Sequence, residues 1–202
     1  LRNFYGMLDT SVTELSLPKI TQITQHDDFI ATLESRVVGV PLEDQLANLD
    51  DQQHEQTEKL YLDAIFQLQN IVVKDMPETY LLFDDAQQSL SANQSFNQFY
   101  SQFLKQKIDR VGQYFAKAYP SFNEKAPQLV TAIQNGKTEK LSIVHGDFFP
   151  GNVLVDEALT QVHGVIDFGS FTLFGNYLLD IAGAFGFYRM YEPNRIQIRQ
   201  KM

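Results

Sequence analysis

The oxygen-bearing side chains best placed for chemistry flank two short apolar segments. Asn152 directly precedes residues 153–155, and Asp167 directly follows residues 162–166. Residues 156–160 between these segments are polar and typical of a turn, so the two segments are predicted to form an antiparallel hairpin. The far ends of a hairpin lie side by side. The spacing therefore predicts that an amide oxygen and a carboxylate meet at the open end.

Asp147 lies a few residues upstream, after an apolar segment at 141–144 that is predicted to be a buried strand. Its loop contains Gly146 and Gly151, and it leads directly into the hairpin. Oxygen ligands of this kind suit Mg²⁺, which takes one or two carboxylates together with waters and phosphates. A carboxylate beside such a site can also accept a proton from an attacking hydroxyl group. Together these are the parts that phosphoryl transfer needs.

The same residues carry a resemblance to a known family. His-Gly-Asp ending at Asp147, then Asn152, then Ile-Asp-Phe-Gly around Asp167 resemble the catalytic and metal-binding loops of the aminoglycoside phosphotransferases. That wider group includes choline, homoserine and fructosamine kinases and has the protein-kinase fold. The resemblance implies that Asp147 is the catalytic base and that Asn152 and Asp167 hold Mg²⁺. It also implies transfer of the terminal phosphate of ATP or GTP to a hydroxyl group of a small molecule.

Two further residues are expected to support this site. Residues 177–182, Tyr-Leu-Leu-Asp-Ile-Ala, look like the family signature at the start of the next helix, in which Asp180 would brace the catalytic loop. His145 is a candidate general base by its residue type, but the resemblance implies a structural role for it, in packing the loop. Phe148 and Phe149 follow the catalytic aspartate, and either could shape the acceptor site or simply pack.

The expected nucleotide contact lies near the start of the chain. Residues 35–42 look like the family's hinge, so the backbone of Ser35, Arg36 and Val37 is expected to meet the adenine ring.

Some parts of a kinase do not appear in the sequence. There is no Gly-x-Gly-x-x-Gly motif, and Lys19 is too close to the hinge to be the lysine that pairs with a helix glutamate. Because the chain begins at Leu1 and ends at Met202, soon after the Asp180 helix starts, we expect a fragment that is a poor catalyst alone. A catalytically inactive pseudokinase that binds a partner is the alternative. A two-metal phosphohydrolase is disfavoured, since it needs more carboxylates or histidines.

The predicted fold class is α+β: a mostly helical protein-kinase-like C-terminal lobe with a short catalytic β-hairpin, plus a remnant of the N-terminal lobe sheet. Residues 1–40 are predicted to form that remnant and the hinge, and residues 41–202 the C-terminal lobe. Helical periodicity predicts helices over 51–72, 96–118 and 126–133, with the aromatic stripe of the second helix in the core. Residues 29–33 are predicted to be a strand, and 74–94 a loop with a short helix.

Composition excludes several other classes of protein. The net charge of −9 argues against nucleic-acid binding, which needs a basic surface. There is no cysteine, so neither a disulfide framework nor a thiolate zinc site can form. No apolar run is long enough to cross a membrane, and no signal peptide is recognisable at the start. A cytoplasmic enzyme with a small-molecule acceptor is the expectation; oligomeric state is left open.

Overall fold

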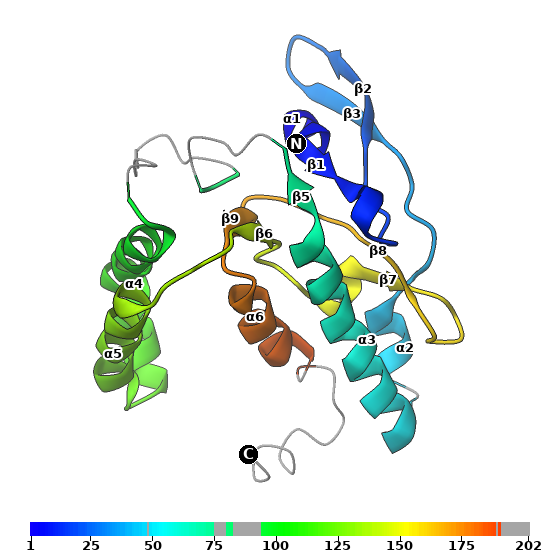
Figure 1. Ribbon diagram of the computed structural model, residues 1–202. Helices are drawn as coiled ribbons and strands as arrows, with labels where there is room; N and C mark the ends of the chain where they lie inside the picture. Colours follow the sequence, from blue (N-terminus) through cyan, green and yellow to red (C-terminus); the bar gives the residue numbers. More distant parts are fainter. Residues whose placement is uncertain (48, 75–79, 83–93, 189, 191–202) are drawn as a thin grey trace. The chain divides into compact units, whose positions relative to one another are not determined.

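The computed structural model describes residues 1–47, 49–74, 80–82, 94–188 and 190, and these form two compact units (Figure 1). The first unit comprises Leu1–Met76, Leu81–Phe83 and Ser142–Met202, and the second comprises Pro77–Tyr80 and Asp84–Leu141. The loop predicted over 74–94 lies largely outside the described residues.

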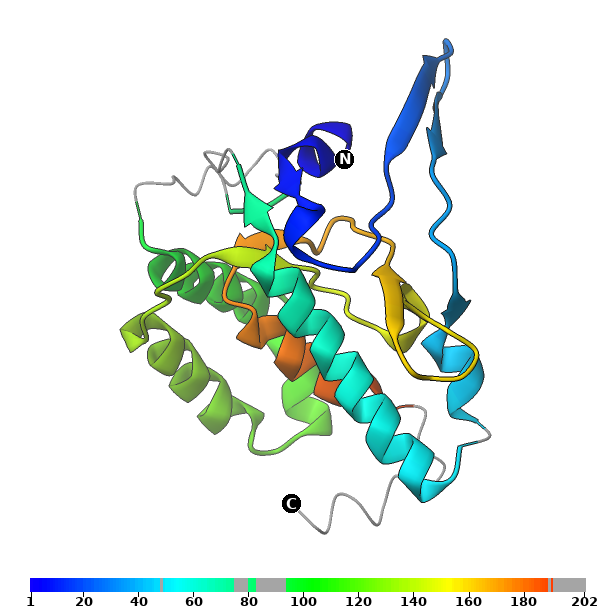
Figure 2. The same cartoon turned by 45° about the vertical axis from the view of Figure 1, so that its right-hand side comes forward.

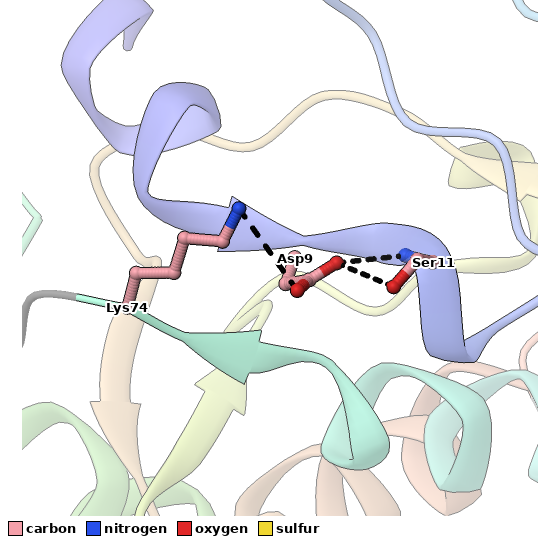
Figure 3. A network of polar contacts seen from close by, with 3 residues as sticks. All are labelled: Asp9, Ser11 and Lys74. Atoms are coloured by element: carbon pink, nitrogen blue, oxygen red, sulfur yellow. Dashed lines mark hydrogen bonds and ion pairs between the residues drawn. The ribbon is translucent and has the colours of Figure 1, made fainter.

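The first unit begins with short elements that the sequence did not predict. They are α1 (Arg2–Met7), β1 (Leu8–Asp9) and the 3-10 turn η1 (Thr10–Val12). β1 pairs antiparallel with β5 (Val72–Val73). The helix predicted over 51–72 therefore ends at Asn70, two residues before the predicted end. The Asp9 side chain caps η1 by accepting hydrogen bonds from the backbone N–H and hydroxyl of Ser11, and it lies 3.9 Å from Lys74 Nζ (Figure 3). These bonds, with the hydroxyl of Ser11 first, lower the pKa of Asp9.

An exposed hairpin follows, formed by β2 (Ile20–Gln25) and β3 (Ile30–Glu34). The two strands are antiparallel, with Gln25 opposite Ile30 at the turn and Ile20 opposite Glu34 at the base. The predicted strand over 29–33 is thus confirmed, one residue later in the chain. In both views the hairpin projects away from the helices of the first unit (Figures 1 and 2).

Two small sheets position the loops that contain Asp147, Asn152 and Asp167. The first has the order β4-β7-β8, formed by β4 (Val40–Pro41), β7 (Val153–Val155) and β8 (Val162–Val165). The second pairs β6 (Ser142–Val144) with β9 (Leu173–Gly175). The predicted strand before His145 and the predicted hairpin are both confirmed. The pairing of β4, which lies within the predicted hinge, with β7 was not predicted, because two residues carry no periodicity.

Three helices of the first unit cover these sheets: α2 (Leu42–Leu46), α3 (Asp51–Asn70) and α6 (Leu178–Tyr188). α3 begins at a capping box in which Asp50 accepts from the Gln53 N–H and the Gln53 side chain accepts from the Asp50 N–H. One face of α3 is buried in the core, and it carries Thr57, Tyr61, Ala64, Ile65 and Leu68. This spacing of three and four residues is what predicted the helix.

The second unit is a helical hairpin of α4 (Phe96–Ala118) and α5 (Phe122–Asn135). Ser95 and Gln98 form a capping box at the start of α4. The prediction that the aromatic stripe of α4 is core was right only for its first half. Phe96 and Phe99 are buried, whereas Tyr114 is 64% exposed and Phe115 is 47% exposed. α5 contacts α4 near both ends, with Asn97 bonded to Ile133 and Phe115 stacked on Phe122, yet this packing leaves Tyr114 and Phe115 partly open to solvent. Helical spacing locates a stripe but does not show how completely the neighbouring helix covers it.

None of the helices within the described ranges is long and apolar enough to cross a membrane.

Candidate active site

The open end of the β7–β8 hairpin brings Asn152 beside the residue that precedes Asp167. Val153 pairs with Val165, and the Ile166 N–H donates to the Asn152 carbonyl over 2.9 Å. The Asn152 side chain in turn donates from Nδ2 to the Asp147 carbonyl over 3.0 Å. This bond leaves the amide oxygen of Asn152 as the atom available to a ligand.

Asp167 has a left-handed backbone conformation, with φ of 66°. Aspartate tolerates this region better than most residues, and the conformation ends the strand that precedes it. The Asp167 side chain is exposed, whereas those of Asp147 and Asn152 are half-buried. The backbone segments that carry these three residues therefore meet at one end of the hairpin. The convergence of their side-chain oxygens stays a prediction.

Asp180, in the first turn of α6, anchors the loop that leads to Asp147. Its buried carboxylate accepts hydrogen bonds from the backbone N–H of His145 at 2.7 Å and of Gly146 at 2.9 Å. Burial raises the pKa of Asp180 to about 6, and the two N–H donors oppose that shift.

His145 is buried and uses both ring nitrogens within the fold. Nδ1 accepts from the Asp147 N–H at 3.3 Å, so Nε2 carries the proton and donates to the Ile166 carbonyl at 2.8 Å. Burial lowers the pKa of His145, which favours this neutral form. With both nitrogens engaged, the imidazole has no free position from which to act as a general base.

Thr172 and Gly146 complete the loop, and sequence reasoning missed Thr172. Its hydroxyl donates to the His145 carbonyl over 3.1 Å and accepts from the Gly169 N–H over 3.0 Å, so it joins the loop after β6 to the loop after β8. Gly146 has φ of 79°, and a Cβ there would lie 2.1 Å from the Phe171 carbonyl oxygen. Only glycine satisfies both conditions.

The aromatic ring of Phe168, the residue after Asp167, packs against α1 and against His145. The ring of Phe168 is buried, with its centroid 4.7 Å from that of His145 and 5.5 Å from that of Phe4 on α1. Tyr5 meets the same ring edge-on. Burial, followed by the charges of Glu34 and Asp167, raises the pKa of Tyr5 to about 12, which places Tyr5 within the electrostatic field of the site.

The two residues after Asp147 have different surroundings. Phe148 is buried against Tyr61, with ring centroids 5.2 Å apart, so it packs and does not line an acceptor site. Phe149 is half-buried and meets Phe187 edge-on at 5.6 Å. Only Phe149 remains a candidate for shaping an acceptor site.

The predicted hinge, residues 35–42, is irregular over 35–39 and then contains β4 and the first residue of α2. Ser35 and Arg36 are exposed, whereas Val37 is buried. Ser35 makes two hydrogen bonds to the backbone of Lys19. Its hydroxyl accepts from the Lys19 N–H at 3.0 Å, and its own N–H donates to the Lys19 carbonyl at 2.8 Å. Lys19 therefore lies beside the hinge, as its position in the sequence indicated.

The oxygen atoms at this site fit a hard cation that shares its coordination with phosphate. No group of three or more His, Cys, Asp or Glu side chains that could hold a metal occurs among the described residues. The oxygen-bearing residues that the hairpin and the loop before it carry to this end are Asn152, Asp167 and Asp147. Mg²⁺ accepts so small a protein contribution when waters and substrate phosphates supply the other ligands.

Comparison with known proteins identifies the family of the chain. A model of the phosphotransferase enzyme family matches residues 13–200. No protein of curated function matches the chain.

Solved structures of similar fold include aminoglycoside phosphotransferases. A thermostable mutant of APH(4)-Ia, in complex with AMP-PNP and hygromycin B, is 19% identical with a TM-score of 0.64, covering 97% of this chain and 62% of that one. APH(3'')-Id from Streptomyces rimosus, with ADP and streptomycin, is 14% identical with a TM-score of 0.55, covering 95% and 66%. An APH(2") enzyme with GDP and kanamycin is 17% identical with a TM-score of 0.55, covering 92% and 62%.

The chain thus spans less than two thirds of the length of each of these structures. At these identities the likeness establishes a shared protein-kinase-like α+β fold. The family match, which covers most of the sequence, establishes more: this chain belongs to the phosphotransferase enzyme family.

Proposed function

We propose that the protein transfers the terminal phosphate of a nucleoside triphosphate to a hydroxyl group of a small molecule, with Asp147 as the catalytic base. The observation that most directly supports this proposal is a pair of hydrogen bonds. Asn152 donates from its side chain to the Asp147 carbonyl and accepts at its own carbonyl from the Ile166 N–H, so both loops lie at one end of the hairpin. Asn152 and Asp167 would hold Mg²⁺, which supplies charge neutralisation on the phosphates.

The remaining residues take positioning roles in this proposal. His145 and Asp180 hold the backbone of the loop, so that Asp147 is presented at a defined position to the acceptor hydroxyl. Asp147 accepts the proton of that hydroxyl as the oxygen attacks the phosphorus. The backbone of Ser35, Arg36 and Val37 would contact the adenine or guanine ring. Residues 1–40 would then belong to the nucleotide lobe and residues 41–202 to the C-terminal lobe.

The acceptor is proposed at the level of its class. Structures of similar fold hold hygromycin B, streptomycin or kanamycin, which are polycationic hydroxyl compounds, and the net charge of −9 is favourable for a cation. Those structures hold adenine or guanine nucleotides, so ATP and GTP are both candidates. A cytoplasmic location would fit such substrates.

The test is the replacement of Asp147 in the full-length protein. Asp147→Ala is expected to abolish phosphate transfer to hydroxyl acceptors while nucleotide affinity changes less than about threefold, because the base contacts the acceptor and not the nucleotide. Asp28→Ala, on the exposed turn between β2 and β3, is the control and should retain turnover. Retained turnover in Asp147→Ala would refute the role. Nucleotide binding without turnover in the unmodified protein would favour the pseudokinase alternative.

A further inference from the structure

A buried hydroxyl group joins helix α3 to the catalytic loop. The hydroxyl of Tyr61 donates a hydrogen bond to the carbonyl of Phe148, the residue immediately after Asp147. Tyr61 is 2% exposed and Phe148 is 1% exposed, so this bond forms where water has little access. The two residues are 87 positions apart in the chain.

The neighbouring carbonyl groups of the loop have partners within the loop itself. The Asp147 carbonyl accepts from the Phe149 N–H at 2.9 Å and from the Asn152 side chain, and the Phe149 carbonyl accepts from the Asn152 N–H at 2.9 Å. The Phe148 carbonyl lies between them and accepts from α3. Leaving a buried carbonyl without a hydrogen-bond donor costs free energy. The loop is therefore most stable in the conformation in which the Phe148 carbonyl keeps its bond to Tyr61.

We propose that Tyr61 is a positioning residue for Asp147. This inference rests on the proposed function, because it assigns Tyr61 a part in presenting the catalytic base. Asp180 holds the loop on the side before Asp147, through His145 and Gly146, and Tyr61 holds it on the side after. With the backbone secured on both sides, the Asp147 carboxylate has a restricted range of positions, which is what orientation of an attacking hydroxyl requires.

The surroundings of Tyr61 provide a matched control. α3 and α6 lie side by side in the first unit (Figure 2). Between them is an open pocket of about 350 Å³, and Tyr61, Ile181 and Tyr188 are among the residues that line it. The rings of Tyr61 and Tyr188 have centroids 5.5 Å apart. The Tyr188 hydroxyl donates to the His54 carbonyl at 3.3 Å, in α3 and away from the catalytic loop. Tyr61→Phe and Tyr188→Phe therefore each remove a phenolic oxygen from a residue that lines this pocket. The hydrogen bond lost in Tyr61→Phe goes to the catalytic loop, whereas the one lost in Tyr188→Phe goes to α3.

The first measurement is amide hydrogen exchange in the full-length protein, which does not depend on activity. In Tyr61→Phe the Phe149 amide is expected to exchange about tenfold faster or more, because its bond to the Asp147 carbonyl lies within the released segment. In Tyr188→Phe it should exchange as in the unmodified protein. Unchanged exchange in Tyr61→Phe, or equal acceleration in both variants, would overturn the inference.

The second measurement is steady-state kinetics with ATP and the best hydroxyl acceptor found for the unmodified protein. Tyr61→Phe is expected to lower kcat about tenfold or more with little change in the KM for nucleotide, while Tyr188→Phe stays within about twofold of the unmodified protein. A kcat within twofold in Tyr61→Phe would overturn the positioning role. An unmodified protein without turnover would count against the proposed function alone, and the exchange result would then decide whether Tyr61 anchors the loop.

Discussion

The carboxylate of Asp180 accepts a 2.7 Å hydrogen bond from the backbone N–H of His145, which lies 35 positions earlier in the chain. Its other oxygen accepts from the Gly146 N–H at 2.9 Å. Two adjacent peptide groups are thus held by one side chain at the start of α6. Since the carboxylate is buried, its charge is poorly hydrated, and the two N–H groups provide much of its stabilisation.

The raised pKa of Asp180 predicts a specific dependence of stability on pH. The folded-state pKa of about 6 exceeds the usual value of 3.8, so the folded protein binds the Asp180 proton more tightly than the unfolded chain does. The stabilisation from this group is therefore present in full below about pH 4 and is lost as the pH rises through about 6. Between pH 5 and 7.5 the free energy of unfolding should fall by about 1–2 kcal/mol from Asp180 alone.

This contribution can be isolated by comparison with Asp180→Asn, which does not titrate. Urea unfolding at several pH values from 5 to 7.5 should show the unmodified protein losing stability relative to the variant as the pH rises. His145 is present in both proteins, so its own titration largely cancels in the difference. A pH-independent difference between the two proteins would contradict the raised pKa.

Replacement of His145 is expected to destabilise the fold strongly. His145→Ala removes a buried ring, its bond to the Ile166 carbonyl and its contact with Phe168, so the free energy of unfolding should fall by about 2–4 kcal/mol. Thermal or urea denaturation measures this loss. His26→Ala is the control: His26 is exposed and stacks on Phe29 at the tip of the hairpin, so its loss should cost less than about 0.5 kcal/mol. Equal effects would show that the ring of His145 is not part of the core.

A methyl group at Gly146 should disrupt the catalytic loop. Gly146→Ala combines a positive φ with a Cβ 2.1 Å from the Phe171 carbonyl oxygen, so the backbone must move, at a cost of about 2–4 kcal/mol. Gly186→Ala in α6, where nothing lies within 4 Å of the added atom, should be neutral or stabilising by up to about 1 kcal/mol. Unfolding free energies of the two variants provide the comparison. A tolerated alanine at position 146 would mean that the loop has another conformation available.

Replacement of Asp167 should weaken nucleotide binding only when Mg²⁺ is present. Under the proposed function, Asp167→Asn removes a charged ligand of the cation, so the affinity for ADP measured by calorimetry with Mg²⁺ should fall about tenfold or more. With EDTA the unmodified protein and the variant should bind alike. Asp28→Asn on the exposed hairpin turn preserves the same change in charge and should leave both affinities unchanged. Equal losses with and without Mg²⁺ would exclude a metal-binding role for Asp167.

The residues proposed for chemistry could be found from the sequence because their relations are local. Asn152 and Asp167 flank a hairpin whose turn and strands are visible in the pattern of residues, and Asp147 lies five residues before Asn152. The α3 and α4 helices were predictable for the same reason, since apolar spacing over twenty residues is a strong signal. Short elements such as α1, β1 and β4 were missed, because, unlike the strands of the hairpin, they are not marked by a continuous apolar run next to a polar turn.

The contacts that hold these residues in place were decided by the tertiary structure. Tyr61 to Phe148, Asp180 to Gly146, and Phe4 to Phe168 each join segments far apart in the chain. No periodicity specifies which distant donor will satisfy a buried carbonyl, or which ring will fill the space beside another. That choice is made when the segments pack together, because each buried polar group must find a partner and each apolar ring must exclude water at the same time. The sequence alone thus determined which groups could react, and only packing determined how they are positioned.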